Sequence, residues 1–213
     1  MEATITTRRG RKHDQVIAGA RRVFLRDGYS RASVDEIARE AGVSKATLYS
    51  YFEDKEKLFT EVIKQECGRQ SDAAIEMIDF DAPAPEVLRT GARHMVGFLL
   101  SEFGQRVFRI CVAEAERFPD IARAFYESGP AHVRARVIAF LETAIARGEL
   151  EIDDVALAAD QFVELCKADL FMKVVFGIRH DFIEAEITRT IEGAVRTFMA
   201  RYAAPGADAG QAE

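Results

Sequence analysis

The sequence has few of the residues that build disulfide or metal sites. Its 213 residues include three cysteines, four histidines and no tryptophan. Cys67, Cys111 and Cys166 lie far apart and form no CxxC pair, which argues against a disulfide framework and a structural zinc site. The histidines, at positions 13, 94, 132 and 180, form no HxxxH or HxxE pair. We therefore expect free thiols, solvated or hydrogen-bonded histidines and no metal.

Long hydrophobic runs are also missing. No stretch approaches the roughly 18 apolar residues of a membrane-spanning helix, and residues 2–12 are largely polar and basic, unlike a signal peptide. Phosphate-binding glycine loops, dinucleotide fingerprints and nucleophile motifs are absent. We expect a soluble cytoplasmic protein that is not an enzyme and needs no cofactor. An enzyme, such as a helical hydrolase with a buried pocket, is the alternative from a different class.

Helical periodicity is present almost everywhere. Apolar residues recur at spacings of three and four, and the 48% hydrophobic content is enough for a substantial core. Gly28, Gly42 and later prolines and glycines divide the chain into helix-length pieces. No strand pattern is found. We predict an all-α fold of about nine helices, with a flexible basic leader over 1–10 and a flexible tail over 203–213.

Charge is unevenly distributed within a net charge of −6. Residues 1–52 hold ten Lys/Arg and six Asp/Glu, a balance of +4, whereas the remainder holds nineteen and twenty-nine, a balance of −10. This division favours contact with a polyanion at the N-terminal end only. The leader charges are interpreted as reaching the minor groove or backbone of DNA, or as a solubilising tail. They belong to Arg8, Arg9, Arg11 and Lys12.

The segment 33–52 carries the most specific pattern. Ser33 with Glu36 is typical of a capping box that opens a short helix. Gly42 suits the left-handed conformation of a sharp turn, and Ser44 caps the helix that follows. Two short helices joined in this way form a helix-turn-helix, whose second helix enters the major groove of DNA.

Leu48 and Phe52 are sufficient to hold the second helix to a core, which leaves its other faces open. The residues there combine donors, a methyl group and phenols, and this mixture suits phosphates and base edges. An ordinary solvated helix is the alternative, although two exposed tyrosines are unfavourable without a partner. The open residues are Lys45, Ala46, Thr47, Tyr49 and Tyr51.

The pattern IAxxAGVSxxTLYxxFxxKxxLF over 37–59 resembles the DNA-binding signature of the TetR/AcrR family of transcriptional repressors. The resemblance implies a helix-turn-helix domain over 11–55, a regulatory and dimerisation domain over 56–202, and a helix over about 55–78 that connects them. Position 51 is often histidine in that family, and Tyr51 can still donate to a phosphate. The implied DNA-binding residues are Ser33, Val34, Ser44, Lys45, Ala46, Thr47, Tyr49, Tyr51 and Lys55.

Beyond about residue 80 the resemblance is looser, although AEAERFP at 113–119 resembles the C-terminal domain of AefR-like members. The family implies a homodimer in which two late helices, here 155–176 and 182–201, pair with a second copy. Their apolar faces exceed what one core requires, and a wholly intramolecular core is the alternative. The expected interface is Phe171, Val174, Val175, Ile187, Ile191, Val195 and Phe198.

Twelve of the fifteen phenylalanines lie from position 80 onward, enough for an apolar pocket as well as a core. The family implies that a small hydrophobic or aromatic effector bound there releases a dimeric repressor from a palindromic DNA operator, by shifting the helix that starts near Lys55. An architectural DNA protein without effector is a further alternative. Candidate ligand-binding residues are His94, Met95, Phe98, Phe108, Cys111, Glu114, His132, Phe162 and Cys166.

Overall fold

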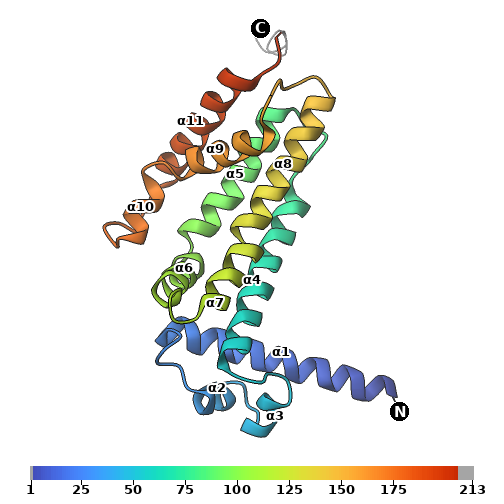
Figure 1. Ribbon diagram of the computed structural model, residues 1–213, viewed down its shortest axis with the longest axis vertical. Helices are drawn as coiled ribbons and strands as arrows, with labels where there is room; N and C mark the ends of the chain where they lie inside the picture. Colours follow the sequence, from blue (N-terminus) through green and yellow to red (C-terminus); the bar gives the residue numbers. More distant parts are fainter. Residues whose placement is uncertain (1, 206–213) are drawn as a thin grey trace. The chain divides into compact units, whose positions relative to one another are not determined.

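The computed structural model describes the backbone of residues 2–205 and the side chains in that range except those of 2–9, 71, 74 and 75. Within this range the chain is helical, which confirms the predicted all-α class, and β pairing is limited to one isolated bridge between Leu150 and Ala203 (Figure 1). None of these helices combines the length and apolarity needed to cross a bilayer. The helices are α1 (Glu2–Asp27), α2 (Val34–Glu40), α3 (Lys45–Tyr49), α4 (Lys55–Met77), α5 (Ala84–Leu100), α6 (Glu102–Glu114), α7 (Pro119–Ser128), α8 (Pro130–Ala146), α9 (Val155–Lys167), α10 (Leu170–Val175) and α11 (Glu184–Tyr202).

The helices form two compact units that are not continuous in sequence. The first unit contains residues up to 69 together with 106–129, and the second contains 70–105 together with the chain from 130 onward. The first unit therefore holds α1 to α3, most of α4, the C-terminal part of α6, and α7. Helices α4 and α6 each run from one unit into the other.

The first unit is built on the close packing of α2 against α1. One face of α1 supplies fully buried apolar residues, among them Val16, Val23 and Phe24. Gly19 lies on the same helix, where a Cβ atom would stand 2.8 Å from the backbone nitrogen of Ala41. The absence of a side chain at position 19 thus allows the end of α2 to approach the backbone of α1.

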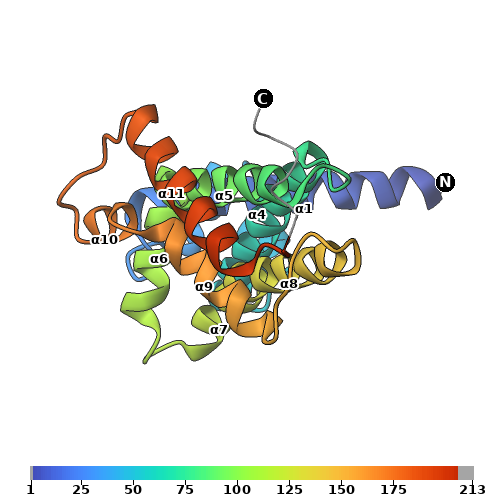
Figure 2. The same cartoon turned by 90° about the horizontal axis from the view of Figure 1, so that it is seen from above.

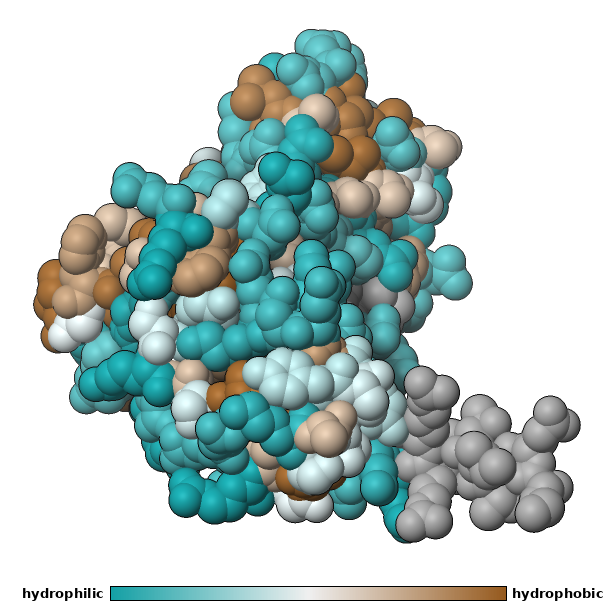
Figure 3. Space-filling model, turned by 60° about the horizontal axis from the view of Figure 1, so that its bottom comes forward, coloured by the Kyte–Doolittle hydropathy of each residue, from teal (hydrophilic) through white to brown (hydrophobic). Residues whose placement is uncertain are grey.

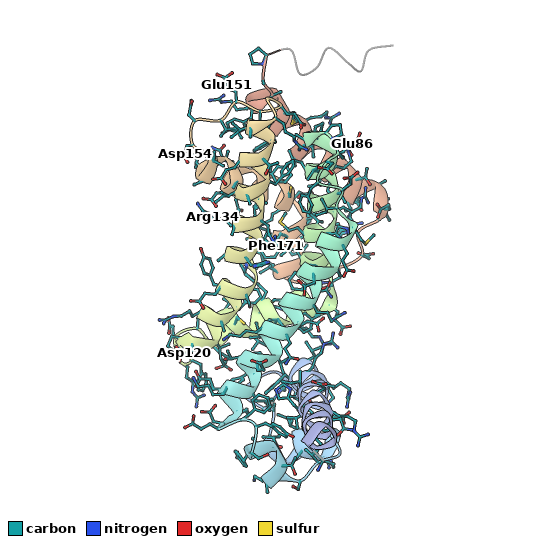
Figure 4. The ribbon with its side chains drawn as sticks, turned by 90° about the vertical axis from the view of Figure 1, so that its right-hand side faces the viewer. Glu86, Asp120, Arg134, Glu151, Asp154 and Phe171 are labelled. Atoms are coloured by element: carbon teal, nitrogen blue, oxygen red, sulfur yellow. The ribbon has the colours of Figure 1, made fainter. Side chains whose placement is uncertain are left out.

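The second unit has its core between α5, α8, α9 and α11. Figure 2 shows α11 lying alongside α5 and α9. Phe162 and Phe198 meet edge to face in this core, with ring centroids 5.2 Å apart. Helix α9 begins at the cap Asp154 (Figure 4), whose Oδ1 accepts a hydrogen bond of 2.9 Å from the amide of Leu157.

Parts of the segments expected to be flexible at the two chain ends are among the described residues. Helix α1 begins at Glu2, so the backbone of the leader 2–10 continues the helix, and no proline interrupts it. At the other end Ala203 bridges to Leu150, and the amide of Ala204 donates to the carbonyl of Glu149 at 3.0 Å. The side chains of Arg8 and Arg9, and the tail residues 206–213, lie outside the described residues.

The helix expected over 155–176 is interrupted, and α9 and α10 are separated at Ala168 and Asp169. Asp169 has φ +63° and ψ −34°, and the amide of Leu170 donates to the carbonyl of Ala168 at 2.8 Å. This is a γ-turn with positive φ, a strained conformation for a residue with a side chain. Helical periodicity continues through the break, so the sequence pattern does not reveal it.

We expect Asp169→Gly to be more stable than Lys173→Met by about 1 kcal/mol in unfolding free energy. Both variants lose the 2.7 Å ion pair between Asp169 and Lys173, but only the glycine relieves the positive φ. Urea denaturation followed by circular dichroism measures the difference. Equal stability of the two variants contradicts the assignment of strain to position 169.

Candidate nucleic-acid interface

The two short helices of the predicted helix-turn-helix are capped as their sequence indicates. The Ser33 side chain accepts a hydrogen bond of 3.2 Å from the amide of Glu36, and the Ser44 side chain accepts one of 3.1 Å from the amide of Thr47. Gly42 takes φ +65° in the turn between them. The caps and the glycine turn together define where α3 begins and how it leaves α2.

Helix α3 is held by its predicted anchors and leaves most other side chains in solvent. Leu48 is fully buried and Phe52 is 7% exposed. Ser44, Lys45 and Ala46 are exposed, as is Tyr49, whereas Val34, Thr47 and Tyr51 are half-buried. Hydrophilic and intermediate residues make up most of the face that Figure 3 shows.

The side chain of Lys45 does not extend freely into solvent. Its Nζ atom lies 2.9 Å from Oδ1 of Asp35, a residue in the first turn of α2. The hydrogen bond to Asp35, reinforced by its charge, raises the pKa of the Lys45 ammonium. Sequence reasoning missed Asp35, because ten positions separate the two residues and no local periodicity connects them.

His13 of α1 is a second residue at this surface that sequence reasoning missed. Its ring lies edge-on to that of Tyr51, with centroids 5.7 Å apart, and 5.3 Å from the ring centroid of Phe52. The contact restricts the Tyr51 ring and connects the end of α3 to α1.

The ammonium of Lys55 is bound to the protein's own backbone, unlike that of a phosphate-binding lysine that extends into solvent. Its Nζ atom donates to the carbonyl oxygens of Tyr29, at 2.9 Å, and Ala32, at 3.1 Å, and lies 4.5 Å from the Tyr29 ring centroid. Burial lowers the pKa of Lys55, although the nearby carboxylate of Glu114 acts in the opposite direction. Two of its three N–H groups thus hold the loop between α1 and α2, and one remains for another acceptor.

Ion pairs connect α1 to α2 around this loop. Arg22 donates to the Glu40 carboxylate at 2.6 Å and to the Glu40 carbonyl at 3.1 Å. Arg26 pairs with Glu36, which also accepts from Arg39 at 3.4 Å. The carboxylate of Glu36 is therefore engaged with arginines, and the helix start carries the Ser33 half of the expected capping box.

Helix α6 contributes contacts to the same loop within the first unit. Arg106 donates to the carbonyl of Leu25, near the end of α1, and Ser30 donates to the carboxylate of Glu114. Phe118, which follows α6, meets the Tyr29 ring edge to face at 4.9 Å. A helix far along the sequence thus supports the loop that leads into the helix-turn-helix.

The predicted ligand-binding residues fall into both units. Phe108, Cys111 and Glu114 lie on α6 in the first unit, where Cys111 is buried. The others lie in the second unit, on three helices. His94, Met95 and Phe98 are half-buried on α5, His132 is exposed on α8, and Phe162 and Cys166 are buried on α9.

Four of the predicted interface residues are committed to the core of the second unit instead. Val174, Ile191, Val195 and Phe198 are at most 2% exposed within a single chain. Phe171, Val175 and Ile187 are half-buried. A groove of about 510 Å³ lies along α9 and α11. It is lined by Gln161, Glu164, Leu165, Ala168, Thr197, Phe198, Arg201 and Tyr202.

Comparison with known proteins identifies this arrangement. The family described as bacterial regulatory proteins, tetR family, matches residues 16–62, and the AefR-like transcriptional repressor C-terminal domain matches residues 86–204. The HTH-type transcriptional repressor BepR of Brucella suis biovar 1 (strain 1330) is 26% identical over 185 residues, 81% of each chain.

Two solved structures extend the likeness over nearly the whole chain. A putative TetR-family regulator from Mesorhizobium loti MAFF303099 is 29% identical with a TM-score of 0.84, covering 92% of this chain and 98% of that one. The flavonoid-responsive regulator FrrA is 39% identical with a TM-score of 0.77, covering 92% and 99%. The chain therefore belongs to the TetR family of transcriptional regulators, which bind DNA and are not enzymes, and it carries an AefR-like C-terminal domain.

Proposed function

We propose that the protein is a dimeric repressor that binds a palindromic operator and is released by a small aromatic or otherwise apolar effector. The observation that carries the proposal is the geometry of α3, a capped helix anchored by Leu48 and Phe52 that presents donors, a methyl group and phenols at the basic end of the chain. A regulator of bacterial DNA acts in the cytoplasm, where that DNA is.

The proposed contacts divide into base reading and phosphate binding. Side chains in the first turn of a recognition helix reach base edges, which assigns Lys45, Ala46 and Thr47 to base reading. Tyr49, the last residue of α3, and Tyr51, which follows the helix, are assigned to the phosphate backbone, where a phenol hydroxyl can donate. Ser33, Val34 and Ser44, at the starts of α2 and α3, are assigned to the phosphate backbone as well.

A homodimer is proposed because one short recognition helix reads only a few base pairs, whereas two-fold symmetry doubles the site. The groove along α9 and α11 supports this part, since it combines apolar Leu165 and Ala168 with the polar ends of Gln161 and Arg201. Val174, Ile191 and Val195 are left out of the proposed interface because they are buried within a single chain, whereas Phe198 lines the groove.

The effector is proposed to bind in the second unit near α5 and α9, which contact each other there. Met95, Phe98, Phe162 and Cys166 supply apolar surface on these helices, and His94 is a polar group for orientation. FrrA, 39% identical to this chain, is flavonoid-responsive, which favours a polyphenolic effector. Helices α4 and α6 run between the units, so we propose that they carry the change that releases DNA.

The DNA-binding part is tested on duplexes that the protein selects from a randomised pool, compared with scrambled duplexes. We expect Lys45→Ala and Thr47→Ala to change sequence preference. Tyr49→Phe should weaken binding to all sequences, because a phosphate donor is lost. Fluorescence anisotropy at several salt concentrations measures both effects. A pool that yields no enriched sequence contradicts specific binding.

The same protein and duplexes test the proposed dimer and the proposed effector. Sedimentation should give a dimer at micromolar concentration, and a monomer that retains full specific affinity contradicts that part. A flavonoid should release the selected duplex, and the duplex should weaken flavonoid binding by the same factor, because coupling between two sites is reciprocal. A flavonoid that binds equally well with and without the duplex contradicts the release mechanism.

A further inference from the structure

Asp35 stands where a carboxylate is unfavourable for a DNA-binding protein. Its side chain is 74% exposed, and it lies in hydrogen-bond contact with the first residue of the recognition helix, Lys45. A negative charge at this position repels the phosphates of any duplex that α3 approaches. Its contribution to stability is small as well, because exposed ion pairs contribute about 0–1 kcal/mol. A carboxylate in the first turn of a helix adds about 0.3–1 kcal/mol, so its role in folding is modest, and it does not raise the general affinity for DNA.

Asp35 restricts the side chain of Lys45. A lysine carries its charge on a flexible stem of four carbons, so a free ammonium at a DNA surface moves to the nearest phosphate. The carboxylate of Asp35 holds Nζ of Lys45 at 2.9 Å. Both helices are fixed by serine caps and by the buried side chains of Ile37 and Leu48, so the backbone of Asp35 keeps its place relative to that of Lys45.

The carboxylate next to Asp35 is engaged with other partners than Lys45. Glu36, next to Asp35, is engaged by Arg26 and Arg39. Lys45 uses one of its three N–H groups for Asp35. The two that remain match the pair of acceptors, O6 and N7, that guanine presents in the major groove.

We infer that Asp35 is a specificity-determining residue that acts through Lys45. It holds the ammonium toward the base edges and away from the phosphates, which favours guanine at one position of each half-site and lowers the affinity for unrelated DNA. The inference rests on the proposed function, in which Lys45 reads bases.

The experiment uses the full-length protein and a duplex that the wild-type chain selects from a randomised pool, with a scrambled duplex as reference. In Asp35→Asn the carboxylate charge is gone, and the neutral amide oxygen holds Lys45 more weakly, so the ammonium moves more readily to a phosphate. We expect the scrambled duplex to bind more tightly and the ratio of selected to scrambled affinity to fall about tenfold. The salt dependence should steepen by about one counterion for each protomer.

Glu53→Gln is the matched control, because it removes one negative charge just after α3 without touching Lys45. Residue 53 is exposed, and its loss should raise affinity for both duplexes alike and leave their ratio unchanged. A fall in the ratio with Glu53→Gln as large as that with Asp35→Asn overturns the inference, since charge alone then explains the effect.

The double variant Asp35→Asn with Lys45→Ala separates the remaining outcomes. If Asp35 acts through Lys45, the ratio in the double variant equals that in Lys45→Ala alone. If Lys45→Ala lowers the ratio and Asp35→Asn does not, the inference is wrong while the proposed function stands. If Lys45→Ala leaves the ratio unchanged, Lys45 does not read bases. The assignment of Lys45 to base reading and the inference are then both wrong.

Discussion

Gly19→Ala is expected to destabilise the first unit by about 3 kcal/mol, at the upper end of the usual range for overpacking, and to abolish DNA binding. The new Cβ would lie 2.8 Å from both the nitrogen and the Cβ of Ala41 and 2.9 Å from its Cα. Backbone atoms cannot turn aside as a flexible side chain can. Helix α2 must therefore move away from α1, and α3 moves with it.

Gly10→Ala is the matched control on the same helix, because a Cβ at position 10 meets nothing within 4 Å. It should be neutral or stabilise by up to about 1 kcal/mol, since alanine is the better helix former. Urea denaturation and anisotropy with the selected duplex measure both variants. Ala41→Gly should fail to rescue Gly19→Ala, because the backbone atoms of residue 41 remain. Wild-type DNA affinity in Gly19→Ala would falsify this account of the α1–α2 contact.

Lys55→Met is expected to lower the unfolding free energy by about 3 kcal/mol, because two carbonyl oxygens lose their donor. Methionine keeps most of the length and apolar body of the side chain, so the loss reports on the hydrogen bonds to Tyr29 and Ala32. The free N–H group is available to a phosphate, and we expect the salt dependence of binding to flatten by about one counterion for each protomer. Unchanged stability contradicts the structural role, and an unchanged salt slope contradicts the phosphate contact.

Lys57→Met is the control for Lys55→Met, since Lys57 is an exposed lysine on the first turn of the same helix. Its loss should change stability by no more than about 0.5 kcal/mol.

The pH dependence of the unfolding free energy gives a further test of the structural role of Lys55. Because burial lowers the pKa of Lys55 in the folded state, the unfolded chain binds more protons as the pH approaches 10.5. Wild-type stability should therefore rise with pH there, relative to Lys55→Met.

Much of the interface follows from short-range chemistry and was predictable. The caps Ser33 and Ser44, the glycine turn at position 42, and the anchors Leu48 and Phe52 all stand in the structure as their pattern indicates. The caps and the glycine turn depend on contacts within about four residues along the chain. The anchors Leu48 and Phe52 were predictable because their spacing of four residues places them on one face of a helix.

The sequence was a weaker guide to whether an apolar helix face packs in the core of its own chain or against a partner. The apolar pattern and the family resemblance predict that Ile191, Val195 and Phe198 face a partner, whereas the structure buries them in the core of their own unit. An apolar stripe on a helix indicates that the face is covered but does not indicate what covers it. The break at Asp169 was missed because a γ-turn leaves the apolar spacing intact.

The sequence alone determined the helical class, the position of the helix-turn-helix and the exposure of Lys45, Ala46 and Tyr49 on α3, because these depend on local propensity and on spacing. Only the tertiary structure decided that Asp35 restrains Lys45, that Lys55 holds the loop before α2, and that the end of α6 with α7 belongs to the first unit. Each of these pairs residues from different helices. Which side chains meet depends on how closely and at what angle the helices cross. Close contacts between helices, such as that of Gly19 with Ala41, set this distance and this angle.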